Sequence, residues 1–185
     1  MTTQNFGDVL IDRREHEHGI DTAVFSPDRA YRYVLTRAWG EGRHACWIML
    51  NPSTADAFAD DPTIRRCLSF TKALGGYGAL TVVNLYALRT TDPRHLPTHP
   101  DPIGPLGGHY LYSQVHAAQD RHDDVIAARG THGARHGRGT AVAQGMANVG
   151  VEMWCLGVTK GGHPKHPLYV AGDTAIVPFM QVGAS

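Results

Sequence analysis

The sequence predicts an α/β domain of three layers, in which helices cover both faces of a four-stranded, mostly parallel sheet and a β-hairpin is added near the N-terminus. Two observations lead to this fold class. From residue 45 onward, apolar runs of strand length alternate with segments of helical periodicity, the order of elements in a doubly wound parallel sheet. The apolar runs are also continuous, as in strands that are buried on both faces.

The N-terminal segment precedes this alternation. Residues 1–20 show no hydrophobic periodicity, and we expect a mobile arm followed by a single α/β domain over residues 21–185. Two strand-like stretches at 22–40 flank the turn sequence "SPDR". Because proline favours the second position of a β-turn, these stretches predict an antiparallel hairpin.

The alternating region begins with a strand at Ala45–Leu50. Asp61 then suits the N-cap of a helix that has Pro62 at its first position and that ends at Gly75-Gly76. The remaining elements are predicted as a strand at 79–88, a long loop at 93–105, a helix at 106–121, a strand at 124–128, a helix containing Val142, Met146 and Val149, and a strand at 152–157.

Composition limits the classes of protein to consider. With 185 residues, 42% of them hydrophobic and 18% charged, the chain has the size and polarity of one soluble globular domain. No apolar run is long enough to span a bilayer and the N-terminus lacks the apolar core of a signal peptide, so we expect a cytoplasmic protein without a membrane partner. Basic and acidic residues number 17 each, so nucleic acid would have to bind a local basic face. The three cysteines are expected to be buried and reduced.

Polar residues follow each predicted parallel strand. They are Asn51-Pro52-Ser53-Thr54, then Asn84, then "ARGTHG" at 128–133, and finally Lys160-Gly161 leading to "HPKHPLY". In open α/β sheets, ligands bind at the carboxyl ends of the strands, where helix N-termini present free N–H groups. We therefore expect a pocket at this end of the sheet.

These motifs resemble those of two families. "NPSTAD", "DDPTIRRC", "VVNLYALRTTDP", "DPIG" and "TKGGHPKHPLY" look like the bacterial and phage domain-of-unknown-function family 1643, over roughly residues 30–170. The order of "LNPS", "VVN", "ARGTHG" and "HPLY" is also remotely similar to the uracil-DNA glycosylase superfamily. The second resemblance implies a glycosylase-like fold, a water-positioning residue at Asn51 and a base-reading residue at Asn84. Arg129-Gly130 stands where that superfamily often has Trp-Gly, and "HPLY" where it has His-Pro-Ser.

Hydrolysis of an N-glycosidic bond, the activity that the second resemblance implies, needs a held water, a negative or dipolar group near the sugar and a donor for the departing base. Asn51 would hold the water, although an Asx turn or helix cap explains it about as well. Asp56 would supply the carboxylate, with Asp60 and Asp61 as alternatives, and Asp61 also suits a helix cap. His166 would donate to the base as negative charge develops there, and a surface loop position is its alternative reading.

Asn84 ends an otherwise apolar strand, where a buried amide without partners costs free energy. It either holds the backbone or reads a base, and we favour the second. The predicted catalytic residues are therefore Asn51, Asp56 and His166. The predicted substrate-binding residues are Pro52, Ser53, Thr54, Phe58, Asn84, Tyr86, Arg89, Gly130, His132, Lys160, Gly161, Pro167 and Tyr169. Basic residues that either contact phosphates or form a solvated face are Arg65, Arg66, Arg89, Arg129, Arg135, Arg138 and Lys160.

The resulting hypothesis is a protein that recognises a nucleobase, a nucleotide or nucleic acid, with hydrolysis of a base–sugar bond as its activity. We expect no metal and no cofactor, because no Cys or His set has zinc spacing and the glycine-rich segment matches no nucleotide-binding fingerprint. Two alternatives stay open: a non-catalytic module that binds a nucleotide or modified base, and a structural or interaction protein.

Overall fold

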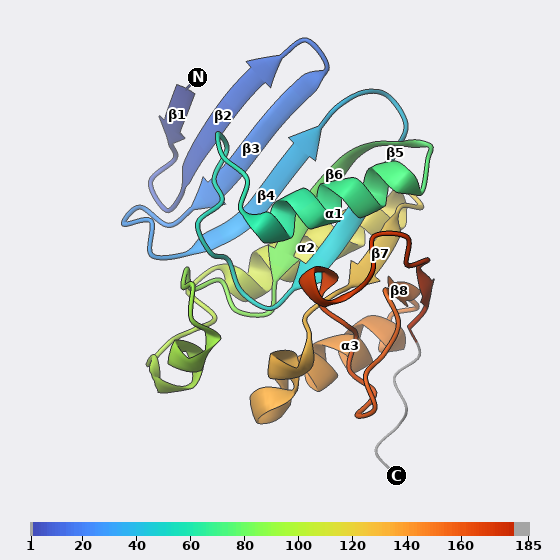
Figure 1. Ribbon diagram of the computed structural model, residues 1–185. Coiled ribbons are helices and arrows are strands. Elements are labelled where there is room, and N and C mark those ends of the chain that lie inside the picture. The colour runs from blue at the N-terminus through green and yellow to red at the C-terminus, as the bar shows by residue number, and fades with distance from the viewer. Residues whose placement is uncertain (1, 180–185) are drawn as a thin grey trace.

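A computed structural model describes residues 2–179, apart from the side chains of residues 134–136. All of its strands belong to one sheet (Figure 1). The elements follow in the order β1 (Thr2–Asn5), β2 (Leu10–His16), β3 (Gly19–Phe25), β4 (Arg32–Ala38), β5 (Arg43–Met49), α1 (Pro62–Ala73), β6 (Tyr77–Asn84), η1 (Pro93–Thr98), α2 (Gly107–Asp120), β7 (Asp124–Ala127), η2 (Thr131–Gly137), α3 (Arg138–Asn148), β8 (Met153–Cys155), η3 (Pro167–Tyr169) and β9 (Val177–Pro178), where η denotes a 3-10 helix.

The sheet is mixed and has nine strands, in the order β1-β2-β3-β4-β6-β5-β7-β8-β9. β6, β5, β7 and β8 pair in parallel. β1, β2, β3 and β4 pair antiparallel in succession, β4 is also antiparallel to β6, and β9 is antiparallel to β8. The predicted four-stranded, mostly parallel sheet of the glycosylase type is therefore wrong, although the protein is α/β. Hydrophobic periodicity reports which faces of a strand are buried, not which strand lies beside it, so it did not show that β4 joins β6.

The N-terminal residues extend this sheet. The segment predicted as a mobile arm contributes β1 and β2, and β2 pairs along its whole length with β3. Asp12 of β2 is 1% exposed, and its two carboxylate oxygens accept hydrogen bonds from Arg29 at 2.7 and 2.8 Å. A buried acid interrupts the apolar alternation by which a strand is recognised. The turn predicted at residues 26–29 does connect two antiparallel strands, β3 and β4.

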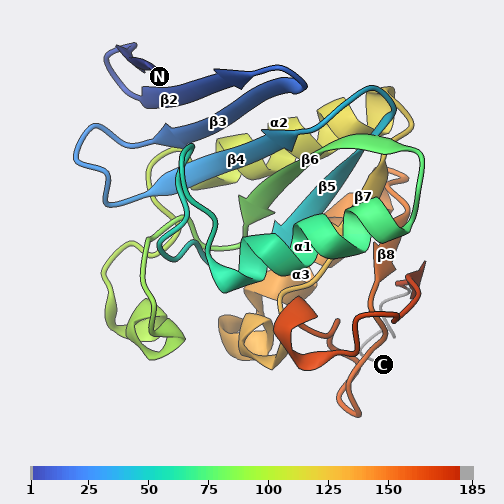
Figure 2. The ribbon, with the colours of Figure 1, turned by 45° about the horizontal axis from the view of Figure 1, so that its top comes forward.

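Helices cover both faces of the parallel part of the sheet: α1 lies on one face, and α2 and α3 lie on the other (Figure 2). Successive residues of β5 enter the two cores alternately. Trp47 and Met49 pack in the α1 core, while Cys46 and Ile48 pack in the α2–α3 core. This burial on both sides explains the continuous apolar run of the strand. Asp61 caps α1 as predicted, with its Oδ1 accepting the N–H of Ile64 at 2.9 Å.

The three cysteines are free and buried, as predicted. Burial raises the pKa of Cys46 to about 12, and it also raises the pKa of Cys67 and Cys155. These thiols are therefore packing groups and not thiolate nucleophiles at neutral pH. Within residues 2–179, the structure has no helix with the length and apolar character needed to cross a membrane.

Candidate functional site

The candidate site lies where the parallel strands end. Met49 of β5 is the register partner of Asn84 of β6, while Ile48 and Cys155 are both aligned with Ala127 of β7. The loops that leave these strand ends surround a cavity of about 630 Å³. This volume is in the usual range for small-molecule sites.

The cavity brings together residues from four separate loops. The predicted site residues that line it are Asn51, Ser53, Thr54, Asn84, Gly130, His132, His166 and Tyr169. The side chains assigned to the water, the base and the leaving group are thus part of one cavity, although they are far apart in the sequence. Their chemical roles stay predictions.

Asn84 has an amide that the protein leaves open. The residue is 4% exposed, and neither its Nδ2 nor its Oδ1 has a hydrogen-bond partner. A buried donor or acceptor without a partner costs about 1–3 kcal/mol. If Asn84 served to hold the backbone, its amide would bond to a main-chain group, and in the described structure it bonds to none.

Asn51 has an amide whose orientation is set by the backbone. Its Nδ2 donates to the carbonyl oxygens of Pro52 at 2.9 Å and Thr90 at 2.8 Å. Because both partners accept, the nitrogen must occupy this position, and Oδ1 is left as the acceptor. Asn51 therefore fixes a turn and also lines the cavity.

His166 is held as a neutral donor. Its Nδ1 accepts the N–H of Leu168 at the start of η3, so in the neutral ring the proton sits on Nε2. Burial lowers the pKa of His166 to about 4, with the nearby Asp61 acting in the opposite direction. At neutral pH the ring thus offers one N–H donor and no charge.

Two buried arginines of the cavity are not among the predicted catalytic and substrate-binding residues. Arg32 of β4 is 2% exposed, donates from Nη1 to the carbonyl of Ala55 at 2.8 Å, and has no partner for Nε. Burial lowers the pKa of Arg32 to about 10, opposed by Asp61. Arg129 follows β7, and burial lowers its pKa as well. No feature of the sequence points to Arg32, because it reaches the cavity only through the pairing of β4 with β6. Arg129 is one of several basic residues that the sequence offers as phosphate ligands.

Asp56 and Phe58, which were predicted to contact the substrate, are not among the residues that line the cavity. Oδ1 of Asp56 accepts the N–H groups of Phe58 at 2.8 Å and Ala59 at 2.9 Å, the geometry of an Asx turn. Phe58 packs against the α1 core. Among the described lining residues, Asp61 is the one carboxylate.

Tyr86 and Arg89 also lie outside this cavity. Tyr86 lines a second cavity of about 600 Å³, and the guanidinium of Arg138 lies 5.8 Å from its ring centre. Arg89 stacks on Phe25 at 5.1 Å and donates to a main-chain carbonyl at 3.2 Å. Both residues are thus placed away from the first cavity.

Four further predicted residues are not among those that line the cavity. Pro52 and Pro167 accept hydrogen bonds through their carbonyl oxygens at 2.9 and 3.2 Å. Lys160 and Gly161 occupy the turn at residues 159–162, which is closed by a main-chain hydrogen bond of 2.9 Å. Their predicted contact with a ligand has no support from this position.

Several of the basic residues considered as phosphate ligands are used internally. Arg65, Arg66 and Arg138 donate to main-chain carbonyl oxygens. The side chain of Arg135 lies outside the described residues. Arg129 is the member of this group that lines the first cavity.

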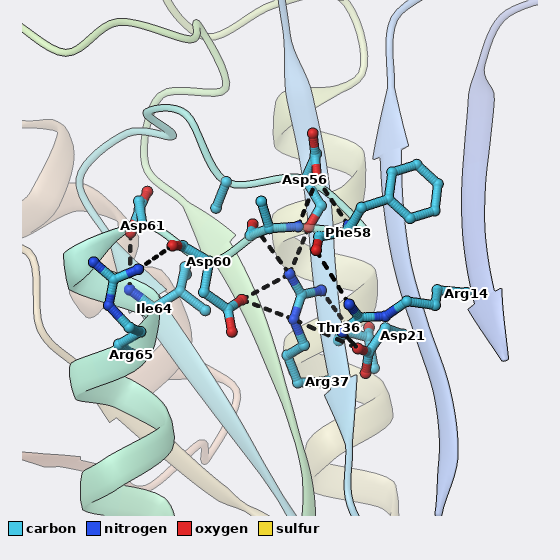
Figure 3. A network of polar contacts seen from close by, with 12 residues as sticks. Arg14, Asp21, Thr36, Arg37, Asp56, Phe58, Asp60, Asp61, Ile64 and Arg65 are labelled. Carbon is cyan, nitrogen blue, oxygen red and sulfur yellow. Dashed lines mark hydrogen bonds and ion pairs between the residues drawn. The ribbon is translucent and has the colours of Figure 1, made fainter. Parts of the chain in front are cut away.

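A network of arginines fixes the loop at residues 55–61 next to the cavity (Figure 3). Arg37 of β4 is 3% exposed and donates from Nε to Oδ1 of Asp60 at 2.9 Å and from Nη2 to the carbonyl of Asp56. Arg14 of β2 donates to another carbonyl of the same loop at 3.1 Å. The antiparallel strands thereby position the loop that ends in Asp61, a residue of the cavity wall.

A family model described as "Protein of unknown function (DUF1643)" matches residues 32–168. The chain belongs to this family. The matched segment begins at the first residue of β4 and includes both buried arginines of the cavity. No curated protein and no solved structure matches the chain, and the remote resemblance to the uracil-DNA glycosylase superfamily is not confirmed.

Replacement of Arg37 tests the network. We expect Arg37→Ala to lower the free energy of unfolding by about 3–5 kcal/mol, because it leaves Asp60 and a loop carbonyl without their buried partner. Arg13→Ala is the matched control, since Arg13 pairs with an exposed glutamate and its loss should cost less than about 1 kcal/mol. Urea denaturation measures both values, and equal losses would contradict a structural role for the network.

The acid sensitivity of the fold tests the state of His166. The pKa of His166 is about 4 in the folded protein, below its ordinary value of about 6.5. As the pH falls, His166 is therefore protonated in the unfolded chain before it is protonated in the folded protein. The free energy of unfolding should be highest above pH 6.5 and should decrease between pH 6.5 and pH 4, by at most about 1.4 kcal/mol per pH unit. His166→Gln should flatten this slope, whereas replacement of the exposed His18 should not. An unchanged slope in denaturation curves of His166→Gln would show that the ring is not buried in its neutral form.

Proposed function

We propose that the cavity binds a nucleobase and that Asn84 reads its edge. The observation that supports this proposal is the buried amide of Asn84, which presents a donor and an acceptor side by side and finds no partner in the protein. Nucleobases carry donors and acceptors next to each other in one plane, and an asparagine amide can bind such an edge through two hydrogen bonds.

The surroundings of Asn84 suit a flat heteroaromatic group. Met49, Leu50, Ile64 and Val82 line the same cavity and offer apolar contact to the faces of a base. The amide adds selectivity, because a ligand without a complementary pair of polar groups leaves both amide atoms desolvated and unpaired. A purely apolar compound is therefore a poor ligand for this cavity.

A second candidate is hydrolysis of the bond between base and sugar. It is favoured by the presence of Asn51, Asp61 and His166 in the same cavity. A water held by Oδ1 of Asn51 would add its oxygen to the anomeric carbon as the carbon–nitrogen bond breaks. The bond's electron pair would leave with the base, which accepts a hydrogen bond from Nε2 of His166 and takes up one proton of the water, while Asp61 stabilises the positive charge on the sugar.

The Asn84→Leu variant separates base reading from a structural role. We expect it to raise the free energy of unfolding by about 1–3 kcal/mol, because it replaces an unpaired buried amide by an apolar side chain of the same branching, and the adjoining cavity has room for its larger volume. The same variant should bind nucleosides at least about tenfold more weakly, since one good bidentate pair contributes about 1–3 kcal/mol.

Calorimetric titration with adenosine, guanosine, cytidine, uridine and inosine, together with urea denaturation, measures both effects. Asn148→Leu on the exposed end of α3 is the matched control and should change neither property. A less stable Asn84→Leu protein would show that the amide supports the fold, and wild-type protein that binds none of these nucleosides would end the proposal.

Release of free base tests the second candidate. Wild-type protein incubated with nucleosides, nucleotides and DNA containing uracil or hypoxanthine should liberate the base, as detected by chromatography. Asn51→Ala should slow this release at least about 100-fold, because the water loses its acceptor. Ligand binding without release by the wild-type protein would leave a binding module and exclude the hydrolysis.

A further inference from the structure

Arg129 is a buried cation that no acid neutralises. It lies two residues beyond β7, is 4% exposed and lines the first cavity. Its Nη1 is buried and has no hydrogen-bond partner. Among the side chains that the structure describes, none forms an ion pair with it. A charge removed from water in this way needs a counter-charge or donors that are satisfied.

Two glycines leave room for this side chain. A Cβ atom at Gly133 would lie 2.6 Å from Cδ of Arg129, and one at Gly139 would lie 2.5 Å from Nη1. Neither glycine has the positive φ that favours its residue type, so the requirement at both positions is space. The two glycines therefore leave space for the Arg129 side chain and, at Gly139, also for the carbonyl oxygen of Gly133, which would lie 2.4 Å from a Cβ atom there.

The other buried arginines of the molecule differ from Arg129. Arg37 pairs with Asp60 at 2.8 Å, and Arg32 lies in the field of Asp61. The contact of Arg129 is with the ring of Phe179, at 5.8 Å from the ring centre. An aromatic face attracts a cation, but it leaves the N–H donors unused.

The described residues that line the cavity carry more positive than negative charge. Arg32, Arg129 and Lys165 face a single carboxylate, that of Asp61, among the described lining residues. Lys165 takes part in none of the ion pairs that the structure describes. Hydroxyl groups from Thr131 and other residues line the same space. A ligand with one or two negative charges would balance this cavity.

The spacing of the sheet relates Arg129 to Asn84. Asn84 ends β6 and Arg129 follows β7, and β5 lies between these two strands. Two inter-strand steps amount to about 10 Å, comparable with the separation of the base and the 5′-phosphate in a nucleotide. We propose that Arg129, with Lys165, forms an anion subsite that takes the phosphate group of a nucleoside phosphate. This inference rests on the proposed nucleobase site at Asn84, because the base occupies that end of the cavity.

Titration of matched ligand pairs tests the subsite. Each nucleoside that binds is compared with its 5′-monophosphate, and we expect the monophosphate to bind at least about tenfold more tightly at low salt. Arg129→Met should abolish this difference and leave the nucleoside affinity within about twofold. Arg13→Met, which changes an exposed arginine of β2, should preserve the difference. Inorganic pyrophosphate should compete with the nucleotide, and sodium chloride should weaken nucleotide binding more than nucleoside binding.

A thermal shift with pyrophosphate provides a second readout, which does not depend on nucleoside binding. Pyrophosphate should raise the melting temperature of the wild-type protein and of Arg13→Met, but not that of Arg129→Met. An oligonucleotide with and without a 5′-phosphate distinguishes the source of the phosphate. Preference for the mononucleotide assigns a free nucleotide, and preference for the phosphorylated oligonucleotide assigns the end of a strand.

The outcomes separate the two proposals. Equal affinities of nucleoside and nucleotide, unchanged by Arg129→Met, would overturn the anion subsite and leave the nucleobase site in place. Pyrophosphate binding that requires Arg129, without binding of any nucleoside or nucleotide, would support the anion subsite and overturn the nucleobase site. No shift and no binding with any of these probes would overturn both.

Discussion

Arginine side chains from β2 and β4 hold the loop at residues 55–61 by its carbonyl oxygens, and one wall of the cavity depends on this contact. The loop contains small buried residues, Ala55 and Ala57, which bury little apolar surface. A guanidinium group has five donors in a fixed plane and can satisfy several carbonyls at once. The antiparallel half of the sheet thus supplies polar contacts that a loop of this composition cannot make for itself.

The buried polar groups that hold this loop differ from those of the cavity in whether they have hydrogen-bond partners. Arg37, which holds the loop, is paired with Asp60 and with a loop carbonyl, as buried polar groups usually are. On the cavity side, Arg32, Asn84 and Arg129 each have a donor or acceptor without a partner. The polar groups that hold the loop are therefore satisfied within the protein, whereas those of the cavity are not, and the unpaired groups lower the stability of the fold. This combination is typical of sites in which a ligand supplies the missing partners.

Sequence reasoning was most successful where burial on both faces leaves a continuous apolar run. The strand at β5 was predicted in this way, and the cap of α1 by Asp61 was predicted from the Asp-Pro pair at the start of the helix. It was least successful for β2, whose buried Asp12 disrupts the pattern, and for Arg32, which reaches the cavity only because β4 pairs with β6.

The same distinction applies to the site. Asn84 was selected because a polar residue ended an apolar strand, and the structure shows it buried and without partners. Asp56 was selected among several acids of one loop, and no local pattern distinguishes an acid that closes a turn from one that lines a pocket. Its hydrogen bonds to the following main chain decide between them.

The outermost strands determine how the sheet meets its surroundings. β1 is four residues long, polar and exposed, and β9 has two residues, one of which is Pro178. Short polar edges, and a proline that lacks an N–H, are poor templates for the addition of another strand. Both edge strands therefore disfavour pairing with a strand of another molecule, which opposes edge-to-edge aggregation of the sheet.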